Sequence, residues 1–224
     1  MTTKTKFQNK KSTKKIQKRD PQKTRAKILD CATECFATSG YEGTSLKNIL
    51  DKAKVNKRMV YHYYGSKESL YRAVHTQQWK LLSEWFTQSL LSTQLDTKSD
   101  HSAKTLLMKS AEIFHDFCAN HQTFLRLILW DGLEGGAVSR SIWEDVRGPL
   151  YQQFVHLFQG ARSQGIELDE LSPDHVIVTF MGAILFYFAY SNSLSDIFGQ
   201  DPLEEKAVQK RKEQVLKQLS KILV

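Results

Sequence analysis

Apolar residues recur at three- and four-residue intervals through most of this 224-residue chain. The first clear stretch begins at Thr24, where Ile28, Ala32 and Phe36 fall on one face of a helix that Gly40 ends. No stretch alternates apolar and polar residues in the way that is typical of a half-buried strand. The periodicity therefore predicts an all-α fold of about nine helices.

Turn residues divide the chain into these helices. Gly65 and Gly165 follow periodic stretches and favour helix ends, whereas the Ser-Pro-Asp sequence at residues 172–174 is typical of a helix start. Gly148 and Pro149 lie inside a periodic stretch, which predicts a kink or a break there. The helices are expected over residues 24–40, 44–53, 57–63, 66–91, 103–120, 122–133, 141–163, 172–193 and 202–222.

Charge is distributed unevenly along the chain. Residues 1–27 contain 11 Lys or Arg and one acidic residue, whereas residues 76–224 contain 14 basic and 18 acidic residues. A cationic end on a mildly acidic body suits a polyanionic partner at that end, either a nucleic acid or an anionic membrane surface. We expect a flexible basic arm over residues 1–22, a small helical domain over 23–75 and a larger helical domain over 76–224.

Cysteine content and hydropathy indicate a cytoplasmic protein without a membrane span. Three cysteines are too few, and odd in number, for a disulfide scaffold, and they fit a reducing compartment. The longest apolar run, Val176 to Tyr190, has 15 residues, whereas a transmembrane helix needs about 20. No apolar stretch follows the charges at the N-terminus, so we expect no secretory signal. We interpret the apolar run as a buried helix.

The helices at 44–53 and 57–63 are separated by a short turn, which predicts a helix-turn-helix motif. In this motif the second helix enters the major groove of DNA with its first side chains against base edges. That helix begins with Lys57 and Arg58, and Arg can bind guanine with two hydrogen bonds. Tyr61 and Tyr63 can donate their hydroxyls to phosphates on either side, and Lys67 adds charge nearby. A half-buried tyrosine-rich helix with a solvated cationic face is the alternative.

The stretch GYEGTSLKNILDKAKVNKRMVYHYYGSKESL, preceded by KILDCATECFATS, resembles the TetR-type transcriptional regulators. Lys54 stands where that family has the turn glycine, so we expect a lysine at positive φ, at a cost of about 1 kcal/mol. Arg58 stands where the family usually has a small residue. The resemblance implies phosphate contacts from Thr44, Ser45, Tyr61, Tyr63 and Lys67, and base-edge contacts from Lys47, Lys57, Arg58 and Met59. His62, between the two tyrosines, completes the expected DNA-binding set.

The resemblance also implies a homodimer in which the last two helices of each subunit form a four-helix bundle. The stretch HVIVTFMGAILFYFAYSNS is apolar on every face, which suits a helix packed against both its own domain and a second subunit. A central buried helix of a monomer is the alternative. The expected interface residues are Ile184, Phe188, Val208, Val215, Leu219 and Ile222.

Family members usually carry an effector cavity in this body, and aromatic residues of the same region are candidates to line one. Rings at helical spacing are also what an ordinary core contains. The expected pocket residues are Phe114, Phe117, Trp130, Trp143, Phe154, Phe180 and Tyr187. Spacings such as that of His115 and His121 fit no compact metal motif. We therefore expect no metal, no cofactor and no catalytic residue, and a chain that is not an enzyme.

The sequence patterns and the resemblance together predict a homodimeric transcriptional regulator, a repressor that binds a palindromic double-stranded DNA operator and is released from it by an unknown small-molecule effector. The first alternative is an architectural DNA-binding protein that responds to no effector. The second is a helical ligand-binding or enzyme-like body whose basic arm binds an anionic membrane.

Overall fold

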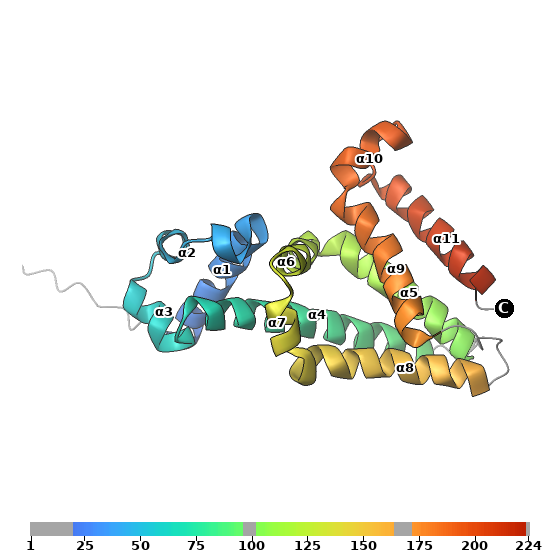
Figure 1. Cartoon of the computed structure of the whole chain (residues 1–224), viewed down its shortest axis with the longest axis horizontal. Coiled ribbons are helices and arrows are strands. Elements are labelled where there is room, and N and C mark those ends of the chain that lie inside the picture. The colour runs from blue at the N-terminus through green and yellow to red at the C-terminus, as the bar shows by residue number, and fades with distance from the viewer. Residues whose placement is uncertain (1–19, 96–101, 164–171, 223–224) are drawn as a thin grey trace, which may run out of the picture.

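The computed structural model describes residues 20–95, 102–163 and 172–222, which form eleven α-helices, one π-helix and no strand (Figure 1). The predicted all-α class is confirmed, with more helices than the nine expected. Two of the additional elements arise where one predicted helix is divided, and a third, the short helix Ala137–Ser141, comes before the predicted start at residue 141. The stretch at 141–163 contains a π-helical turn, and the long apolar stretch after residue 172 bends at Tyr190.

The first three helices and the start of the fourth form a small N-terminal head. Its elements are α1 (Pro21–Gly43), α2 (Leu46–Ala53), α3 (Lys57–Tyr64) and the beginning of α4 (Lys67–Leu95). The apolar faces of these helices meet in one core, which excludes water from the inner sides of all four. Its fully buried members include Ile28, Phe36, Ile49, Val60, Leu70 and Val74.

Helix α1 begins earlier than its apolar periodicity indicates. Asp20 is its N-cap, and one carboxylate oxygen accepts hydrogen bonds from the backbone N–H groups of Gln22 and Lys23, at 3.0 and 3.4 Å. Pro21 stands at the first helical position, where its missing N–H costs nothing. Residues 21 and 22, which were predicted to belong to the arm, therefore form the first turn of α1, and residues 1–19 lie outside the described residues.

The remaining helices form the body. They are α5 (Ala103–Asn120), α6 (Gln122–Leu133), α7 (Ala137–Ser141), η1 (Trp143–Arg147, a π-helix), α8 (Gly148–Ser163), α9 (Pro173–Ala189), α10 (Ser191–Phe198) and α11 (Glu205–Ile222). Helix α4 runs from the head into this body, and α9 to α11 project from one side of it (Figure 1). One long helix thus connects the head directly to the body core.

The predicted kink at Gly148 is a π-helical turn. The backbone N–H of Gly148 donates to the carbonyl of Trp143, five residues earlier. A Cβ at position 148 would lie 2.9 Å from that carbonyl oxygen, so only glycine allows so close an approach. Pro149, which has no N–H to donate, follows directly in the first turn of α8. The wide turn places Trp143 and Arg147 where α8 begins.

The apolar run that was predicted to be a buried helix forms most of α9. Within the described ranges, no helix is by itself long and apolar enough to cross a bilayer. Helices α9 and α10 meet those length and hydropathy criteria only as a pair, and they are bent by 84° relative to each other.

Candidate DNA-binding and ligand-binding sites

Short-range caps fix the geometry of α2, α3 and the turn between them. The Ser45 hydroxyl accepts from the backbone N–H of Asn48 at 3.1 Å, and the Asn56 side chain accepts from that of Met59 at 3.1 Å. Lys54 adopts the left-handed conformation, with φ 53° and ψ 46°, which confirms the positive φ expected there. These residues end α2 and start α3 within a few positions, as a helix-turn-helix requires.

Helix α3 turns one face inward and leaves its cations outside. Val60 is completely buried in the head core, whereas Lys57 and Arg58 at the start of the helix are exposed. Met59 is half-buried and packs against the same core. The arrangement presents two cations at the first turn of α3, the end that enters the groove in helix-turn-helix proteins.

The rings at the end of α3 have different surroundings. Tyr61 is 47% exposed, and the Lys57 ammonium lies 5.6 Å from its ring centre. His62 is exposed and stands edge-on to the half-buried Tyr63, with ring centres 4.9 Å apart. Tyr64 instead donates its hydroxyl to the Arg25 carbonyl at 2.8 Å, which ties α3 to α1. Tyr61 and His62 are thus open to solvent, and Tyr64 is structural.

The remaining predicted DNA contacts surround the start of α2 and of α4. Ser45 and Lys47 are exposed, and Lys67 is half-buried with its ammonium 4.1 Å from the ring centre of Tyr41. Thr44 is only 2% exposed, and its hydroxyl donates to the Cys35 carbonyl at 3.0 Å. A phosphate contact from Thr44 requires that hydroxyl to leave Cys35.

Several cations on the head have no anionic partner within the described part of the chain. Lys47, Lys54, Lys57 and Arg58 are exposed and form no ion pair there. Lys52, by contrast, pairs with Glu34 of α1. Unpaired cations beside a helix-turn-helix can neutralise phosphates without first breaking a salt bridge.

The junction between head and body contains Glu134, which sequence reasoning missed. One of its carboxylate oxygens accepts from the backbone N–H groups of Tyr41 and Glu42, at 2.8 and 3.1 Å, and the other accepts the Tyr71 hydroxyl at 3.4 Å. Gly40, at φ 67°, lets the backbone approach so closely that a Cβ there would lie 2.6 Å from Glu134. This carboxylate holds the end of α1 against the body, and no local sequence pattern marks it.

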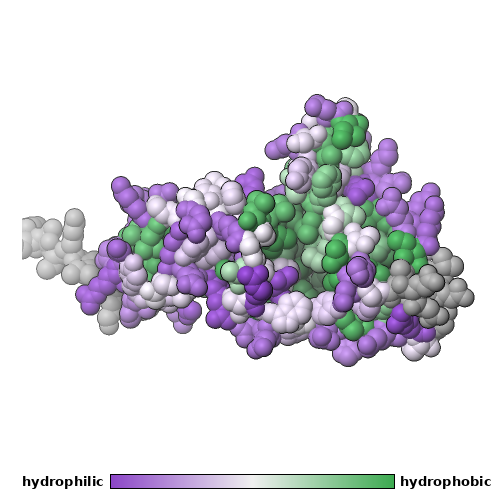
Figure 2. All heavy atoms as spheres, in the orientation of Figure 1, coloured by the Kyte–Doolittle hydropathy of each residue, from purple (hydrophilic) through white to green (hydrophobic). Residues whose placement is uncertain are grey.

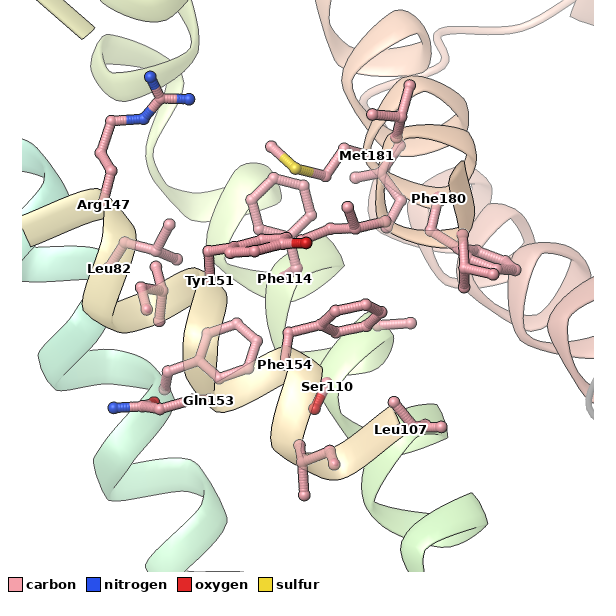
Figure 3. A pocket seen from close by; sticks show the side chains of 18 of the residues that line it. Leu82, Leu107, Ser110, Phe114, Arg147, Tyr151, Gln153, Phe154, Phe180 and Met181 are labelled. Carbon is pink, nitrogen blue, oxygen red and sulfur yellow. The ribbon is translucent and has the colours of Figure 1, made fainter. Parts of the chain in front are cut away.

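The body contains a mainly apolar cavity of about 500 Å³ between α4, α5, η1, α8 and α9, and Leu219 of α11 also lines it (Figure 3). Volumes of this size are usual for small-molecule sites. Trp79, Leu82, Phe86 and Leu90 of α4 form one side of it. The lining also includes four of the seven predicted pocket residues: Phe114, Trp143, Phe154 and Phe180.

The structure places the other three predicted pocket residues outside the cavity lining. Phe117 is fully buried and stacks on His121, with ring centres 4.0 Å apart. Trp130 lies against the backbone of Gly40 at the junction with the head. Tyr187 donates its hydroxyl to the Pro202 carbonyl at 2.5 Å. Each ring lies on a face of its helix that meets another part of the core, and aromatic composition alone does not reveal this.

Few polar groups line the cavity; Ser110, Tyr151 and Asp174 are bonded within the protein, whereas the buried Nε1–H of Trp79 has no partner among the described residues. The Ser110 hydroxyl donates to the Leu106 carbonyl at 2.8 Å, and the Tyr151 hydroxyl donates to Asp174. Arg147 is different, because its guanidinium stacks on Trp79 and Trp143, at 4.7 and 5.7 Å from the ring centres, and forms no ion pair within the described ranges. Sequence reasoning missed this residue, although Trp143 and Arg147 are four apart, the spacing of neighbours on one helix face.

The six predicted dimer residues mostly face their own chain. Ile184, Phe188, Val215 and Leu219 are buried within the body, and Val208 packs partly buried against its core. Of the six, Ile222 is the most open to solvent, with 38% of its surface exposed. Other apolar side chains on α9 and α10 are open: Val178, Phe186, Tyr190, Ile197 and Phe198. Figure 2 shows apolar side chains gathered over these two helices, whereas the head is mainly hydrophilic.

Comparison with known proteins agrees with this architecture. Residues 28–74 match the family described as bacterial regulatory proteins, tetR family, and residues 104–218 match the tetracyclin repressor-like C-terminal domain. The HTH-type transcriptional repressor SCO4008 of Streptomyces coelicolor is 28% identical over 157 residues, which are 70% of this chain and 74% of that protein. The HTH-type transcriptional repressor NicS of Pseudomonas putida is 24% identical over 188 residues, 83% of this chain and 85% of that protein.

Solved structures show the same fold at low sequence identity. A bacterial regulatory protein of the tetR family from Rhodococcus RHA1 superposes with a TM-score of 0.68 at 16% identity, over 90% of this chain and 97% of that one. The transcriptional regulator SCO4942 of Streptomyces coelicolor has a TM-score of 0.65 at 24% identity, over 89% and 97%. With both domains matched and the helix-turn-helix geometry in place, the chain belongs to the TetR family of DNA-binding transcriptional regulators.

Proposed function

We propose that this protein is a homodimeric cytoplasmic repressor that binds a palindromic operator and releases it when a small molecule enters the body cavity. The observation that carries the proposal is the course of α4. This helix lines the cavity with Trp79, Leu82, Phe86 and Leu90. Only Gly65 and Ser66 separate its first turn from α3, the helix proposed to read the bases and called the reading helix below. A ligand in the cavity therefore touches the element that holds the reading helix.

We assign DNA reading to the head. Lys57 and Arg58, exposed on the first turn of α3, are proposed to contact base edges together with Lys47 and Met59. Ser45, Tyr61, His62, Tyr63 and Lys67 surround them and are proposed to contact phosphates. The support is geometric, because the proposed base readers are on the first turns of α2 and α3 while the ring of Tyr61 is open to solvent. Residues 23–75 form the DNA-binding domain in this proposal, and 76–224 the effector and dimer domain.

The exposed apolar stripe on α9 is proposed to pack against a second copy of the chain. Phe186 and Tyr190, the C-cap of α9, are four residues apart and therefore lie on one side of the helix, and the exposed Val178 lies about two turns before Phe186. Phe186 and Tyr190 also stack on each other, with ring centres 4.6 Å apart. Large exposed apolar side chains that form a row are typical of an interface. Two heads held by such a dimer match the two half-sites of a palindrome.

Repression and release follow as a population shift. The ligand favours a body conformation in which α4, and with it α3, takes a different position, so the two heads no longer fit successive grooves. The ligand shifts the equilibrium only by its difference in affinity for the two conformations. An architectural DNA-binding protein without an effector is the second candidate, and the apolar cavity beside α4 argues against it.

The test begins with selection of a binding sequence from random DNA by the purified protein. We expect a palindromic sequence bound by two chains. A library of small molecules is then screened for loss of binding to that operator. Release by a compound that fails to release a variant with the cavity filled, Ala111→Trp, supports the proposal. Sequence-specific binding that no compound weakens favours the architectural alternative.

A further inference from the structure

We propose that the body cavity binds an elongated, mainly apolar molecule with a single anionic group, and that the guanidinium of Arg147 binds that group. The inference rests on the proposed effector function, and it adds the chemical class of the ligand and the residue that recognises it. In Figure 3, Arg147 lies at one end of the lining and Leu107 toward the other, with the rings of Phe114, Tyr151 and Phe154 between them.

Arg147 is a half-buried cation held by aromatic rings instead of an anion. Its guanidinium lies 4.7 Å from the centre of the Trp79 ring and 5.7 Å from that of Trp143. Among the described residues, no oxygen accepts a hydrogen bond from it. Burial lowers the pKa of Arg147, which reports that water solvates the cation incompletely. A planar guanidinium with free N–H groups is suited to two parallel hydrogen bonds with a carboxylate.

The nearby acid is already committed to another role. Asp131 is close enough to raise the pKa of Arg147, yet it forms no ion pair with it. Its two carboxylate oxygens instead accept from the backbone N–H groups of Val138 and Ser139, each at 3.1 Å. Asp131 therefore caps the start of α7, and the guanidinium keeps its donors for a ligand.

The remainder of the lining determines the shape and polarity of the ligand. Ser110 and Tyr151 have their hydroxyls bonded within the protein, and Gln153 lies at an exposed position. Apart from Asp174, the other lining residues are aliphatic or aromatic and come from α4, α5, η1, α8, α9 and α11. An apolar tail is thus stabilised by burial, while a second polar group away from Arg147 finds a partner only at the exposed Gln153 or by competing for the hydroxyls and the carboxylate that are already bonded.

A cationic ligand fits the charges of this cavity less well. Asp174 is the acid of the lining, and it is exposed in the first turn of α9. There it accepts the Tyr151 hydroxyl, and the partial positive charge of the helix N-terminus stabilises it further. A cationic group of a ligand would compete with the Tyr151 hydroxyl for the solvated Asp174 carboxylate. The rest of that ligand would lie beside the unpaired cation of Arg147.

Three probes with one decyl chain but different head groups separate these possibilities: decanoate, decan-1-ol and decyltrimethylammonium. Binding to the full-length protein is measured by isothermal titration calorimetry at concentrations below micelle formation. We expect decanoate to bind at least about tenfold more tightly than the alcohol, because its carboxylate forms charge-assisted hydrogen bonds with the Arg147 guanidinium. The ammonium probe is expected to bind more weakly than the alcohol. Equal binding of decanoate and the alcohol, or tighter binding of the ammonium probe, overturns the proposal.

Variants locate the recognising group. Arg147→Met keeps an apolar stem against Trp79 and should reduce decanoate binding to the level of the alcohol, with alcohol binding unchanged within about twofold. Arg147→Lys keeps the charge but loses the planar guanidinium that can form two parallel hydrogen bonds, so we expect an intermediate preference for decanoate over the alcohol. Gln153→Leu is the matched control, because it removes a lining polar group without charge. A preference for decanoate that survives Arg147→Met contradicts the assignment. If Arg147→Met fails to fold, the assignment is tested by the preference of the unmodified protein for decanoate and by the expected decrease of that preference in Arg147→Lys.

Operator release, measured separately with the selected DNA, distinguishes this inference from the proposed function. If decanoate binds through Arg147 but does not weaken operator binding, the proposed ligand class is supported and ligand-relieved repression is contradicted. Release of the operator by decan-1-ol or the ammonium probe, with no preference for decanoate, supports an effector cavity and overturns the anionic ligand class.

Discussion

Arg58 occupies the second position of α3, exposed and without an ion pair among the described residues. A guanidinium at this place can form two hydrogen bonds to one guanine. We predict that Arg58→Ala weakens operator binding by about 1–3 kcal/mol and relaxes base preference at one position of each half-site. Binding measured on the operator, on operators changed at single positions and on random DNA provides the check.

The matched control for that prediction is Lys52→Ala. Lys52 belongs to α2 and carries the same charge, but its ammonium is paired with Glu34. This control should leave base preference unchanged. An Arg58 variant that loses equal affinity for operator and random DNA shows that Arg58 contacts the backbone only, because phosphate contacts carry no sequence information.

His75 makes stability depend on pH. It is 1% exposed, and burial lowers its pKa to about 4, with Asp131 opposing and Arg147 reinforcing the shift. Tyr71 covers the ring edge-on, with centres 4.5 Å apart. Because the folded pKa is below the ordinary value of about 6.5, the unfolded chain binds the proton more readily. The contribution to stability is complete above about pH 6.5 and is lost as pH falls toward the folded value, about 2 kcal/mol by pH 5.

Urea unfolding of the parent protein and of His75→Leu at pH 7 and pH 5 tests this expectation. Carboxylate titrations affect both proteins, so the difference between them isolates the histidine. Between pH 7 and pH 5, the free energy of unfolding should fall by about 2 kcal/mol more for the parent protein than for His75→Leu. Identical pH dependence in the two proteins contradicts a neutral buried His75.

At the scale of elements, contacts between helices connect the head to the body. Helix α6 meets the end of α1 through Glu134, and η1 meets α4 through Asp145, whose carboxylate lies 2.9 Å from Arg72. The π-helical turn also places Trp143 and Arg147 at the cavity. Short π-helical segments occur frequently at functional sites, because the inserted residue redirects its neighbours. Residues that line the cavity and a residue that contacts the head thus lie in one segment of five residues.

Glu134→Ala should destabilise the junction of α1 and α6. The change leaves the backbone N–H groups of Tyr41 and Glu42 without their acceptor, and we expect the free energy of unfolding to fall by about 1–3 kcal/mol. Operator binding should weaken as well, because the backbone leading into α2 is no longer fixed. Glu134→Gln is the control, since its amide oxygen still accepts, and a smaller loss is expected in chemical unfolding. Equal losses in both variants indicate that the charge, and not the acceptor geometry, matters.

At the scale of the whole molecule, the row of exposed apolar side chains on α9 is proposed to pack against a second copy of the chain. Phe186 is 55% exposed at the centre of that row. We predict that Phe186→Glu converts a dimer to a monomer, because a buried carboxylate without a partner costs several kcal/mol at such an interface. Operator affinity should fall with it, since one head contacts one half-site.

Sedimentation velocity over a range of protein concentrations measures the predicted change. The control is Gln214→Glu, which adds the same charge at an exposed position of α11. This control should keep the oligomeric state of the parent protein. A Phe186→Glu variant with unchanged mass in solution shows that the α9 row is not the interface.

The sequence alone predicted the helical class, the helix α3 and the turn before it. Helix periodicity, caps such as Asn56 and the cations after it are local properties, so they can be seen within about ten residues of chain. The positive φ of Lys54 was predicted for the same reason. The family resemblance likewise came from one contiguous stretch, and both matched domains bear it out.

The tertiary structure decided which face each apolar helix turns inward. Ile184 and Phe186 are two residues apart in the same apolar run, yet the first is buried in the body and the second is exposed. Periodicity cannot make that distinction in a helix that is apolar on every side. The cavity, the carboxylate of Glu134 between two backbone N–H groups and the unpaired guanidinium of Arg147 depend on segments far apart in the chain. Such contacts leave no local pattern, because they arise only when the helices pack.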